Sequence, residues 1–358
     1  MSEGNRRAAL FGACRYERRR ERAKGEPIVT TKFRWGAPLA VIGLAACLSP
    51  GLGVGSAAAD ATVRVGKAIA LPFDFTPLDV GMAKGFYKKH GLDIEEINFA
   101  GSAKLQQGLA ADAVDIGLGS GPELAFVAKG NTDLGVAAFA GPANGLLLIV
   151  RPDAGIDGPA GLKGKRIGVS TVGGLTDWMV HQVSVKQGWG PDGIRNTALG
   201  TDEAQIAALR TKDLDGMCID VAGAYTLQEA GAAKIVLNFG SIVPDFINHI
   251  TYASNKFIAG HPDELREFLA GWFETVAWMR KNKDETVKIA APVMHKTPEI
   301  AARAYDVVMP SLSDTGKFDP KALKVLANSF IDMKLLDHAP DMSKLYTEKF
   351  LPSAPATN

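Results

Sequence analysis

Short apolar runs of strand length alternate with segments of helical period from Thr62 onward. In the first part of this region the pattern predicts strands at 63–66, 92–99, 115–118 and 134–139. Between them, apolar residues that recur every three or four positions predict helices at 78–90, 103–111 and 122–129. Because strands that alternate with helices form parallel sheets covered on both faces, this order predicts an α/β lobe.

The same order restarts after an apolar segment at 146–151. Strands are predicted at 166–170, 216–219 and 234–237, and helices at 176–187, 202–212 and 222–230. A returning strand at 250–254 precedes a helical region, with helices expected at 262–282, 284–294, 298–308 and 320–333. In the first of these helices, Trp272, Phe273, Val276 and Met279 recur at helical spacing, which predicts core packing.

These patterns predict an α/β protein of two lobes, each with a mostly parallel sheet, joined by two extended strands. We expect an export segment at 1–59, the first lobe at 60–150 and 251–358, and the second lobe at 151–250. The helical C-terminal segment is expected to pack back onto the first lobe. Because ligands of such sheets bind beyond the carboxyl ends of the strands, we expect the site in the cleft between the lobes.

Composition fits this architecture and argues against a nucleic-acid partner. The 358 residues are 46% hydrophobic and 22% charged, which is ordinary for a globular chain long enough for two cores. Ten of the 40 basic and four of the 39 acidic residues precede Asp60, which leaves 30 basic and 35 acidic residues beyond it. Such a mildly acidic body lacks the basic face that nucleic-acid binding requires.

The basic excess at the start of the chain precedes an apolar run at 37–48. Small residues in an A-x-A pattern, Ala57, Ala59 and Ala61, follow the run, and this order is typical of a secretory signal peptide. The run is about a dozen residues long, shorter than the roughly 20 that a membrane-spanning helix needs. We therefore expect export to the periplasm and a mature chain that begins near Asp60 or Thr62.

A second interpretation of this segment stays open. The residues from Leu44 to Cys47 resemble a lipobox, the motif after which a bacterial lipoprotein is cut and lipidated on its cysteine. Both motifs are short and easily met by chance, and the A-x-A site favours soluble release over an anchor at Cys47. Translation from Val29 is also open, because the segment before Thr30 is long for a signal peptide.

Cysteine usage predicts neither a disulfide nor a metal site in the mature chain. Cys14 and Cys47 lie in the predicted export segment, which leaves Cys218 alone. Because Cys218 lies in a predicted buried strand, we expect a packed and unreactive thiol. No cofactor is expected.

Several short motifs occur in a fixed order along the chain: A-K-G-F-Y at 83–87 with G-L-D-I-E at 91–95, Q-G-L-A-A-D-A-V-D-I-G at 107–117, L-K-G-K-R-I-G-V at 162–169, A-A-L with D-G at 207–216, and H-P-D-E at 261–264. In sequence and spacing they resemble the nitrate/sulfonate/taurine family of ABC-transporter substrate-binding proteins, also described as NMT1/THI5-like. The resemblance extends from about Thr62 to Leu336, which is most of the chain.

The resemblance implies a type II periplasmic binding fold. It implies that the chain is the substrate-binding component of an ABC importer and delivers a small molecule to a permease in the inner membrane. The family's ligands differ widely, so sulfonate- or taurine-like molecules, carboxylates and pyrimidine-like heterocycles all stay open. We expect a monomer with no nucleic-acid partner.

Candidate ligand contacts follow the predicted strands, where small residues open the next helix. These residues are Ser102, Ser120, Gly121, Thr171, Gly173, Gly174 and Thr176. Amides and hydroxyls at such junctions bind an anion or a polar ligand edge, although the same residues also serve as helix caps. We expect Ser120 and Thr171 to hold one polar end of the ligand from opposite lobes.

Aromatic and acidic residues complete the predicted site. Phe73 lies in a loop after the first strand and Phe139 ends the fourth, so both are candidate ring contacts. Asp74, Asp220 and Asp245 are candidate acceptors for donors on the ligand. No Arg or Lys occurs in these loops, which favours a monoanion, a zwitterion or a neutral ring over a doubly charged anion and permits an amine on the ligand.

An enzyme is the main alternative. The fold family is similar to the fungal pyrimidine-precursor synthase, whose chemistry depends on a His and a Cys-rich segment, whereas here Cys218 stands alone. Residues 117–121 match neither G-x-S-x-G nor G-x-G-x-x-G, because Leu118 and Pro122 occupy required glycine positions. We therefore predict no catalytic residue, and a ligand-sensing partner of a membrane receptor stays open as a third interpretation.

Overall fold

Ten strands form two five-stranded sheets in residues 60–353, the part of the chain that this computed structural model describes. The predicted export segment at 1–59, with the alternative lipid anchor at Cys47, lies outside the described residues. Within 60–353, no helix combines the length and the apolar character needed to cross a membrane.

The first sheet has the order β2-β1-β3-β10-β4. Its strands are β1 (Ala61–Lys67), β2 (Leu92–Asn98), β3 (Ile116–Ser120), β4 (Asp133–Ala140) and β10 (His249–Ser254). Strand β1 pairs in parallel with both β2 and β3, whereas β10 runs antiparallel between β3 and β4. The apolar runs are therefore the interior of a mostly parallel sheet, as the sequence predicts.

The second sheet repeats this plan with the order β7-β6-β8-β5-β9. Its strands are β5 (Leu146–Val150), β6 (Arg166–Val169), β7 (Arg195–Ala198), β8 (Gly216–Asp220) and β9 (Lys234–Asn238). Strand β5 is antiparallel to both of its neighbours, β8 and β9. Strand β7 was not predicted, because this edge strand of Arg, Asn, Thr and Ala has no apolar run.

The chain passes between the sheets twice, after β4 and after β9. Strand β5 pairs within the second sheet, so the first passage precedes Leu146, whereas the sequence analysis kept this strand in the first lobe up to 150. The second passage precedes His249, because β10 pairs within the first sheet. We call the described chain up to the end of β4 and from the start of β10 onward the first lobe, and the part from β5 to the end of β9 the second lobe.

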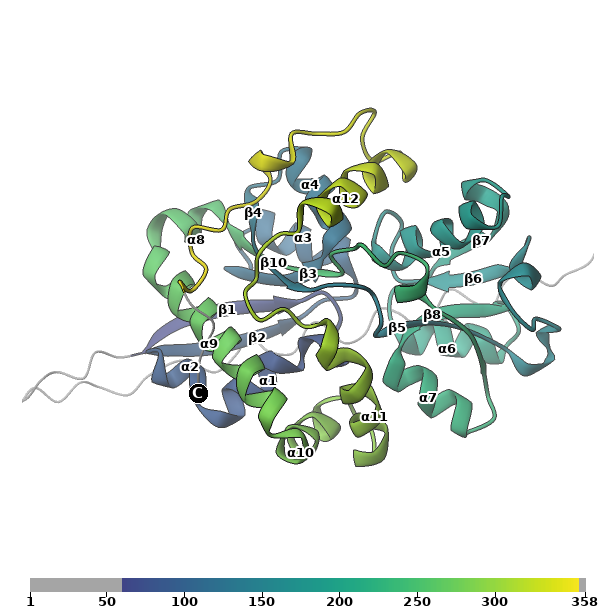
Figure 1. Cartoon of the computed structure of the whole chain (residues 1–358), viewed down its shortest axis with the longest axis horizontal. Helices are drawn as coiled ribbons and strands as arrows, with labels where there is room; N and C mark the ends of the chain where they lie inside the picture. Colours follow the sequence, from purple (N-terminus) through teal and green to yellow (C-terminus); the bar gives the residue numbers. More distant parts are fainter. Residues whose placement is uncertain (1–59, 354–358) are drawn as a thin grey trace, which may run out of the picture. The chain divides into compact units, whose positions relative to one another are not determined.

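Helices cover both faces of each sheet. In Figure 1, α3 (Ser102–Ala110), α4 (Leu124–Ala128) and α12 (Pro320–Asp332) lie above the first sheet. Helices α1 (Thr76–Lys84), α2 (Phe86–Lys89), α9 (Pro262–Lys281) and α10 (Lys283–Val293) lie below it. In the second lobe, α5 (Leu175–Lys186) lies above the sheet, and α6 (Asp202–Arg210) and α7 (Val221–Glu229) lie below it.

Two further helices belong to the C-terminal region, α8 (Asn255–Gly260) and α11 (Pro298–Val308). The single helix expected at 78–90 is two helices, because Gly85 adopts a left-handed conformation (φ 74°) that ends α1. The buried face of α9 confirms the predicted core residues, since Trp272, Phe273, Val276 and Met279 are each at most 3% exposed. Burying such a side chain contributes about 1.5–3 kcal/mol of stability.

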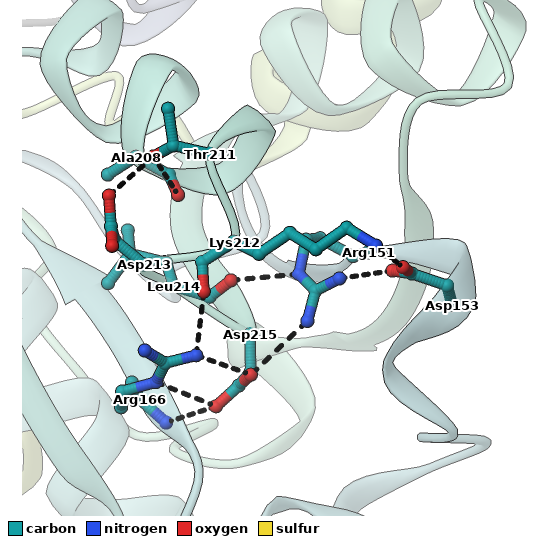
Figure 2. A network of polar contacts seen from close by, with 9 residues as sticks. All are labelled: Arg151, Asp153, Arg166, Ala208, Thr211, Lys212, Asp213, Leu214 and Asp215. Atoms are coloured by element: carbon teal, nitrogen blue, oxygen red, sulfur yellow. Dashed lines mark hydrogen bonds and ion pairs between the residues drawn. The ribbon is translucent and has the colours of Figure 1, made fainter.

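One polar arrangement recurs at the start of a central strand in each lobe. Asp115, just before β3, accepts hydrogen bonds from the backbone N–H of Arg64 (2.9 Å) and from its guanidinium (2.6 and 3.0 Å). Figure 2 shows the counterpart: Asp215, just before β8, accepts from the backbone N–H of Arg166 (2.9 Å), from its guanidinium and from Arg151. These bonds explain why aspartate occupies this place in the D-I-G motif at 115–117 and in the D-G motif at 215–216, since it joins neighbouring parallel strands.

Candidate ligand-binding site

A pocket lies between the lobes, at the carboxyl ends of the parallel strands. The antiparallel strands β10 and β5 begin at the same edges, because His249 is paired with Ser120 and Leu146 with Asp220. The first lobe lines the pocket with Ala68, Ile69, Pro72, Asp74, Phe75, Ser102, Gly119, Ser120, Asn248 and His249. The rest of the lining comes from Gly145, Leu146, Ser170, Leu175, Thr176, Asp202, Gln205, Cys218, Ile219 and Asp220.

Several predicted site residues line this pocket: Asp74, Ser102, Ser120, Thr176 and Asp220. They come from distant parts of the sequence and from both lobes. What they share is a position at the carboxyl end of a parallel strand or in the segment that follows it, as the sequence predicts. Their contact with a ligand stays a prediction.

The predicted aromatic contacts lie behind the pocket wall. The Phe73 side chain is fully buried and packs edge-on against Tyr305, with ring centroids 6.0 Å apart. Phe75, two residues later, lines the pocket in its place. Phe139 is also fully buried and stacks on the imidazole of His249 (5.4 Å between centroids), so it supports a lining residue.

The remaining predicted residues lie outside the lining. Gly121 packs on the backbone of Ile247, where a Cβ would meet the carbonyl oxygen at 2.2 Å. In the loop before α5, Gly173 donates its N–H to Asp177 (3.0 Å), and Thr171 packs against Gly101 of the first lobe. Gly174 lies beside Thr171 and ends this loop, whereas Asp245 is exposed.

The hydroxyls of the lining are also structural. In the first lobe, the backbone N–H of Ser120 donates to Glu123 (2.7 Å), its hydroxyl donates to the same carboxylate (3.1 Å), and Ser102 lies 3.2 Å from that hydroxyl. In the second lobe, Thr176 accepts a hydrogen bond from the backbone N–H of Ser170 (2.9 Å). Ser120 and Thr176 therefore close the turns that follow β3 and β6, in addition to facing the pocket.

Acidic groups dominate the electrostatics of the pocket. Burial raises the pKa of Asp74 to about 6. Burial, followed by the nearby charge of Asp220, raises the pKa of Asp202 to about 7. Burial also raises the pKa of Asp220, against the hydrogen bonds that it accepts from the backbone N–H groups of Ala222 and Gly223.

Basic side chains of the described residues lie outside this acidic lining. Among the described residues, no Arg or Lys lines the pocket or forms an ion pair with Asp74, Asp202 or Asp220. Lys67 ends β1 close by, but its ammonium is buried against Asp79 (2.7 Å) and Glu96 (3.0 Å). Lys296, outside the lining, is the basic residue whose charge lowers the pKa of Asp202 and Asp220.

His249 is neutral and presents an acceptor to the pocket. Burial lowers the pKa of its imidazole to about 4. Its Nδ1 lies 3.1 Å from the carbonyl oxygen of Gly119, which can only accept, so the proton is on Nδ1. The remaining ring nitrogen, Nε2, lies 3.7 Å from a carboxylate oxygen of Asp74.

Four polar residues of the lining were not predicted, for two reasons. Asn248 and His249 lie at the start of an antiparallel strand, whereas Asp202 and Gln205 lie on the first turn of α6, which follows the unpredicted parallel strand β7. A detectable signal was the pair Asn248-His249 directly before the returning strand, because polar residues there reach the same edge as Ser120. Within 60–353, no three His, Cys, Asp or Glu side chains gather closely enough to hold a metal ion.

Comparison with known proteins agrees with this architecture. A model of the family described as NMT1/THI5 like matches residues 72–286, more than half of the chain. The chain belongs to the NMT1/THI5-like family. This confirms the resemblance inferred from its motifs, and the α/β fold with two mostly parallel sheets is confirmed as well.

Proteins similar to this chain differ in what their names say they bind. A Bacillus subtilis (strain 168) protein described as a putative aliphatic sulfonates-binding protein is 25% identical over 82% of this chain and 95% of its own length. The structure of the alkanesulfonate-binding protein SsuA from Xanthomonas axonopodis pv. citri bound to MOPS has a TM-score of 0.68, with 19% identity over 80% of this chain and 96% of its own. The nitrate-binding protein NrtA from Synechocystis PCC 6803 has a TM-score of 0.67, with 16% identity over 81% of this chain and 86% of its own.

Proposed function

We propose that this protein is the exported solute-binding component of an ABC importer. It binds a small organic molecule between its lobes and delivers it to a permease in the inner membrane. The observation that carries the proposal is the pocket itself, which both lobes line at the facing carboxyl edges of their sheets. The family and the names of its sulfonate- and nitrate-binding relatives support it.

The connection between the two sheets suits capture of a ligand. The chain connects the two sheets only by the passages before β5 and before β10, so the described lobes can hinge there. A molecule that touches both lobes binds the closed arrangement better than the open one, and therefore shifts the population toward closure. Release to a permease would require the reverse motion.

Cys218 does not favour the enzyme alternative. Its thiol lines the pocket, but it is 1% exposed and its Sγ lies 3.8 Å from the carbonyl oxygen of Thr176. Burial raises the pKa of this thiol well above its ordinary value, which opposes formation of the nucleophilic thiolate. A packed cysteine of this kind contributes to the wall of a binding pocket rather than to covalent chemistry.

The test is capture of a small molecule from a cell extract. Protein purified from the cells is incubated with a deproteinised metabolite extract, and native mass spectrometry identifies any retained compound. We expect one compound in a 1:1 complex with a monomer, and a smaller radius of gyration by X-ray scattering when it is bound. Retention of no compound, or steady-state conversion of the retained compound to product, would contradict the proposal.

A further inference from the structure

The polar groups that face the pocket are mostly hydrogen-bond acceptors. We infer that the ligand carries an ammonium or amidinium group, bound by Asp74, Asn248 and His249 of the first lobe and by Asp202 and Asp220 of the second. This inference rests on the proposed function, because it names the class of solute that the same pocket takes. It also separates this protein from relatives whose names specify an anion.

The first-lobe wall presents three acceptors together. Asp74 is 4% exposed, and the neutral His249 turns the lone pair of Nε2 toward its carboxylate at 3.7 Å. Asn248 donates its side-chain amide to Asp74, which leaves the Asn248 carbonyl Oδ1 without a partner although the residue is only 2% exposed. Because acceptors do not satisfy one another, this wall requires donors from the molecule that enters.

The second lobe also lines the pocket with more hydrogen-bond acceptors than donors can satisfy. One oxygen of Asp220 accepts the N–H groups of Ala222 and Gly223 at the start of α7, and this leaves its other oxygen for the pocket. Asp202 is not the cap of α6, because Thr201 has that role. The carbonyl Oε1 of Gln205, a residue 1% exposed, also has no partner.

Charge favours a cation over an anion. The carboxylates of Asp74, Asp202 and Asp220 lie close enough for Asp220 to feel the charge of Asp74 and to raise the pKa of Asp202. A sulfonate or nitrate would add a further negative charge to this set, at a cost that grows as water is excluded. An ammonium or amidinium group instead supplies both the missing positive charge and several N–H donors.

Matched pairs of probes test the inference by calorimetry at pH 7.5. The pairs are 2-aminoethanesulfonate with ethanesulfonate, which differ by the amino group, and benzamidine with benzamide, which differ by the charge of the amidinium. We expect the nitrogen cation of at least one pair to bind tenfold or more tightly than its partner. Ethanesulfonate binding as tightly as 2-aminoethanesulfonate, or more tightly, would overturn the inference.

The extract experiment decides the case in which neither pair binds. A retained compound with an ammonium or amidinium group supports the inference, and a retained anion that lacks one overturns it while leaving the proposed function intact. Retention of nothing contradicts the proposed function itself. The two failures are therefore distinguishable.

Substitution of the pocket aspartates Asp74, Asp202 and Asp220, which we call the acidic wall, gives a second, independent measurement of what holds the cation. Asp74→Asn should weaken binding of the cationic compound at least tenfold, and Asp202→Asn should weaken it in the same direction. Asp213→Asn is the matched control, because Asp213 is an exposed carboxylate outside the lining, and the affinity of this variant should not change. Thermal melts check that each variant is folded, and unchanged affinity in folded Asp74→Asn and Asp202→Asn would overturn the inference.

The pH dependence of affinity has a definite sign. A cation binds best to ionised carboxylates, so its affinity should rise as pH increases from 5 to 8, through the range in which Asp74 and Asp202 lose their protons. An anion would show the opposite slope. The titratable and charged groups that face the acidic wall are Asp74, Asp202, Asp220, His249, Glu203 and Lys296. His249 stays neutral over this range, since its pKa is about 4.

Discussion

Asp215 and Asp220 lie at opposite ends of the same short strand, β8, and their surroundings differ completely. At the first end, Asp215 accepts one backbone N–H and two guanidinium groups, from Arg166 and Arg151. At the second end, Asp220 faces the pocket beside Asp202, with no arginine or lysine against it in the described part of the chain. The first lobe repeats the difference, with Asp115 paired to Arg64 at one edge and Asp74 unpaired by a cation at the other.

The pKa values express this difference as free energy. Burial alone would raise the pKa of Asp215, but the hydrogen bonds from Arg166 lower it to about 2. Burial raises the pKa of Asp74 to about 6, because no cation compensates for the lost water. The sheet edge that carries Asp215 thus stabilises the fold, and we call it the stabilising edge. We call the opposite edge, which lines the pocket with Asp74, Asp202 and Asp220, the ligand edge. Its carboxylates are in an electrostatically unfavourable state that a bound cation would relieve.

The largest effect expected is at the stabilising edge. Asp215→Ala removes the acceptor for the backbone N–H of Arg166 and for two guanidinium groups, and should lower the free energy of unfolding by about 2–4 kcal/mol. Chemical denaturation measures the loss. Asp213→Ala is the control, since this exposed aspartate two residues away should cost less than about 0.5 kcal/mol. Equal losses in the two variants would show that the paired carboxylate has no special role.

The contrast between the edges also shows how far the sequence alone can specify this molecule. Apolar runs predicted β1, β3, β6 and β8, since a buried parallel strand needs apolar side chains on both faces. The polar edge strand β7 carries no such signal. The helix break at Gly85 also escaped prediction, because the residues on both sides of it keep a helical pattern.

The site was predictable where it depends on parallel topology and hidden where it does not. Ser120 and Asp220 are the last residues of parallel strands, so their places at the pocket edge follow from the order of strands and helices. Asn248 and His249 reach the same edge only because β10 runs antiparallel to β3. The hydrophobic pattern of a strand does not indicate its direction in the sheet. The choice of Phe73 as the aromatic ring nearest the ligand also depended on local backbone direction, which the sequence does not show. Phe73 is buried in the core, whereas Phe75 lines the pocket.

An intermediate effect is expected when pH changes the charge of the ligand edge in the empty protein. Carboxylates with a raised pKa stabilise the fold below their ordinary pKa of about 4, and this contribution is lost as pH rises through the folded-state value. The contribution of Asp74 is therefore lost between about pH 4 and pH 6, and that of Asp202 between about pH 4 and pH 7. We expect the unfolding free energy of the ligand-free protein to fall by about 1–3 kcal/mol between pH 5 and pH 8.

Thermal melts of the ligand-free protein between pH 5 and 8 measure this trend. Asp202→Asn should flatten the slope and raise the melting temperature at pH 8, because the amide cannot ionise beside Asp220. Asp213→Asn, an exposed change outside the pocket, should keep the slope of the original protein. A melting temperature that rises steadily from pH 5 to 8 would contradict the assignment of an unfavourable ligand edge.

The smallest expected effect concerns contacts that join the lobes away from the pocket. Arg303 on α11 forms an ion pair with Glu229 on α7, and its guanidinium lies 3.7 Å from the ring centroid of Tyr225 on the same helix. Both charged groups are largely exposed, so the pair contributes about 0.5–1 kcal/mol. The partners belong to different lobes, so under the proposed hinge motion the contact is lost when the lobes separate, and Arg303→Ala should weaken binding of the captured compound about two- to fivefold.

Lys283→Ala is the matched control: Lys283 also pairs with an acid, Asp306, and lies over a tyrosine ring, but both partners are on α11 of its own lobe. That variant should keep its affinity, since its contacts are the same in the open and closed arrangements. Calorimetry on the two variants separates a contribution to closure from a general loss of surface charge, and equal losses would assign the effect to charge alone.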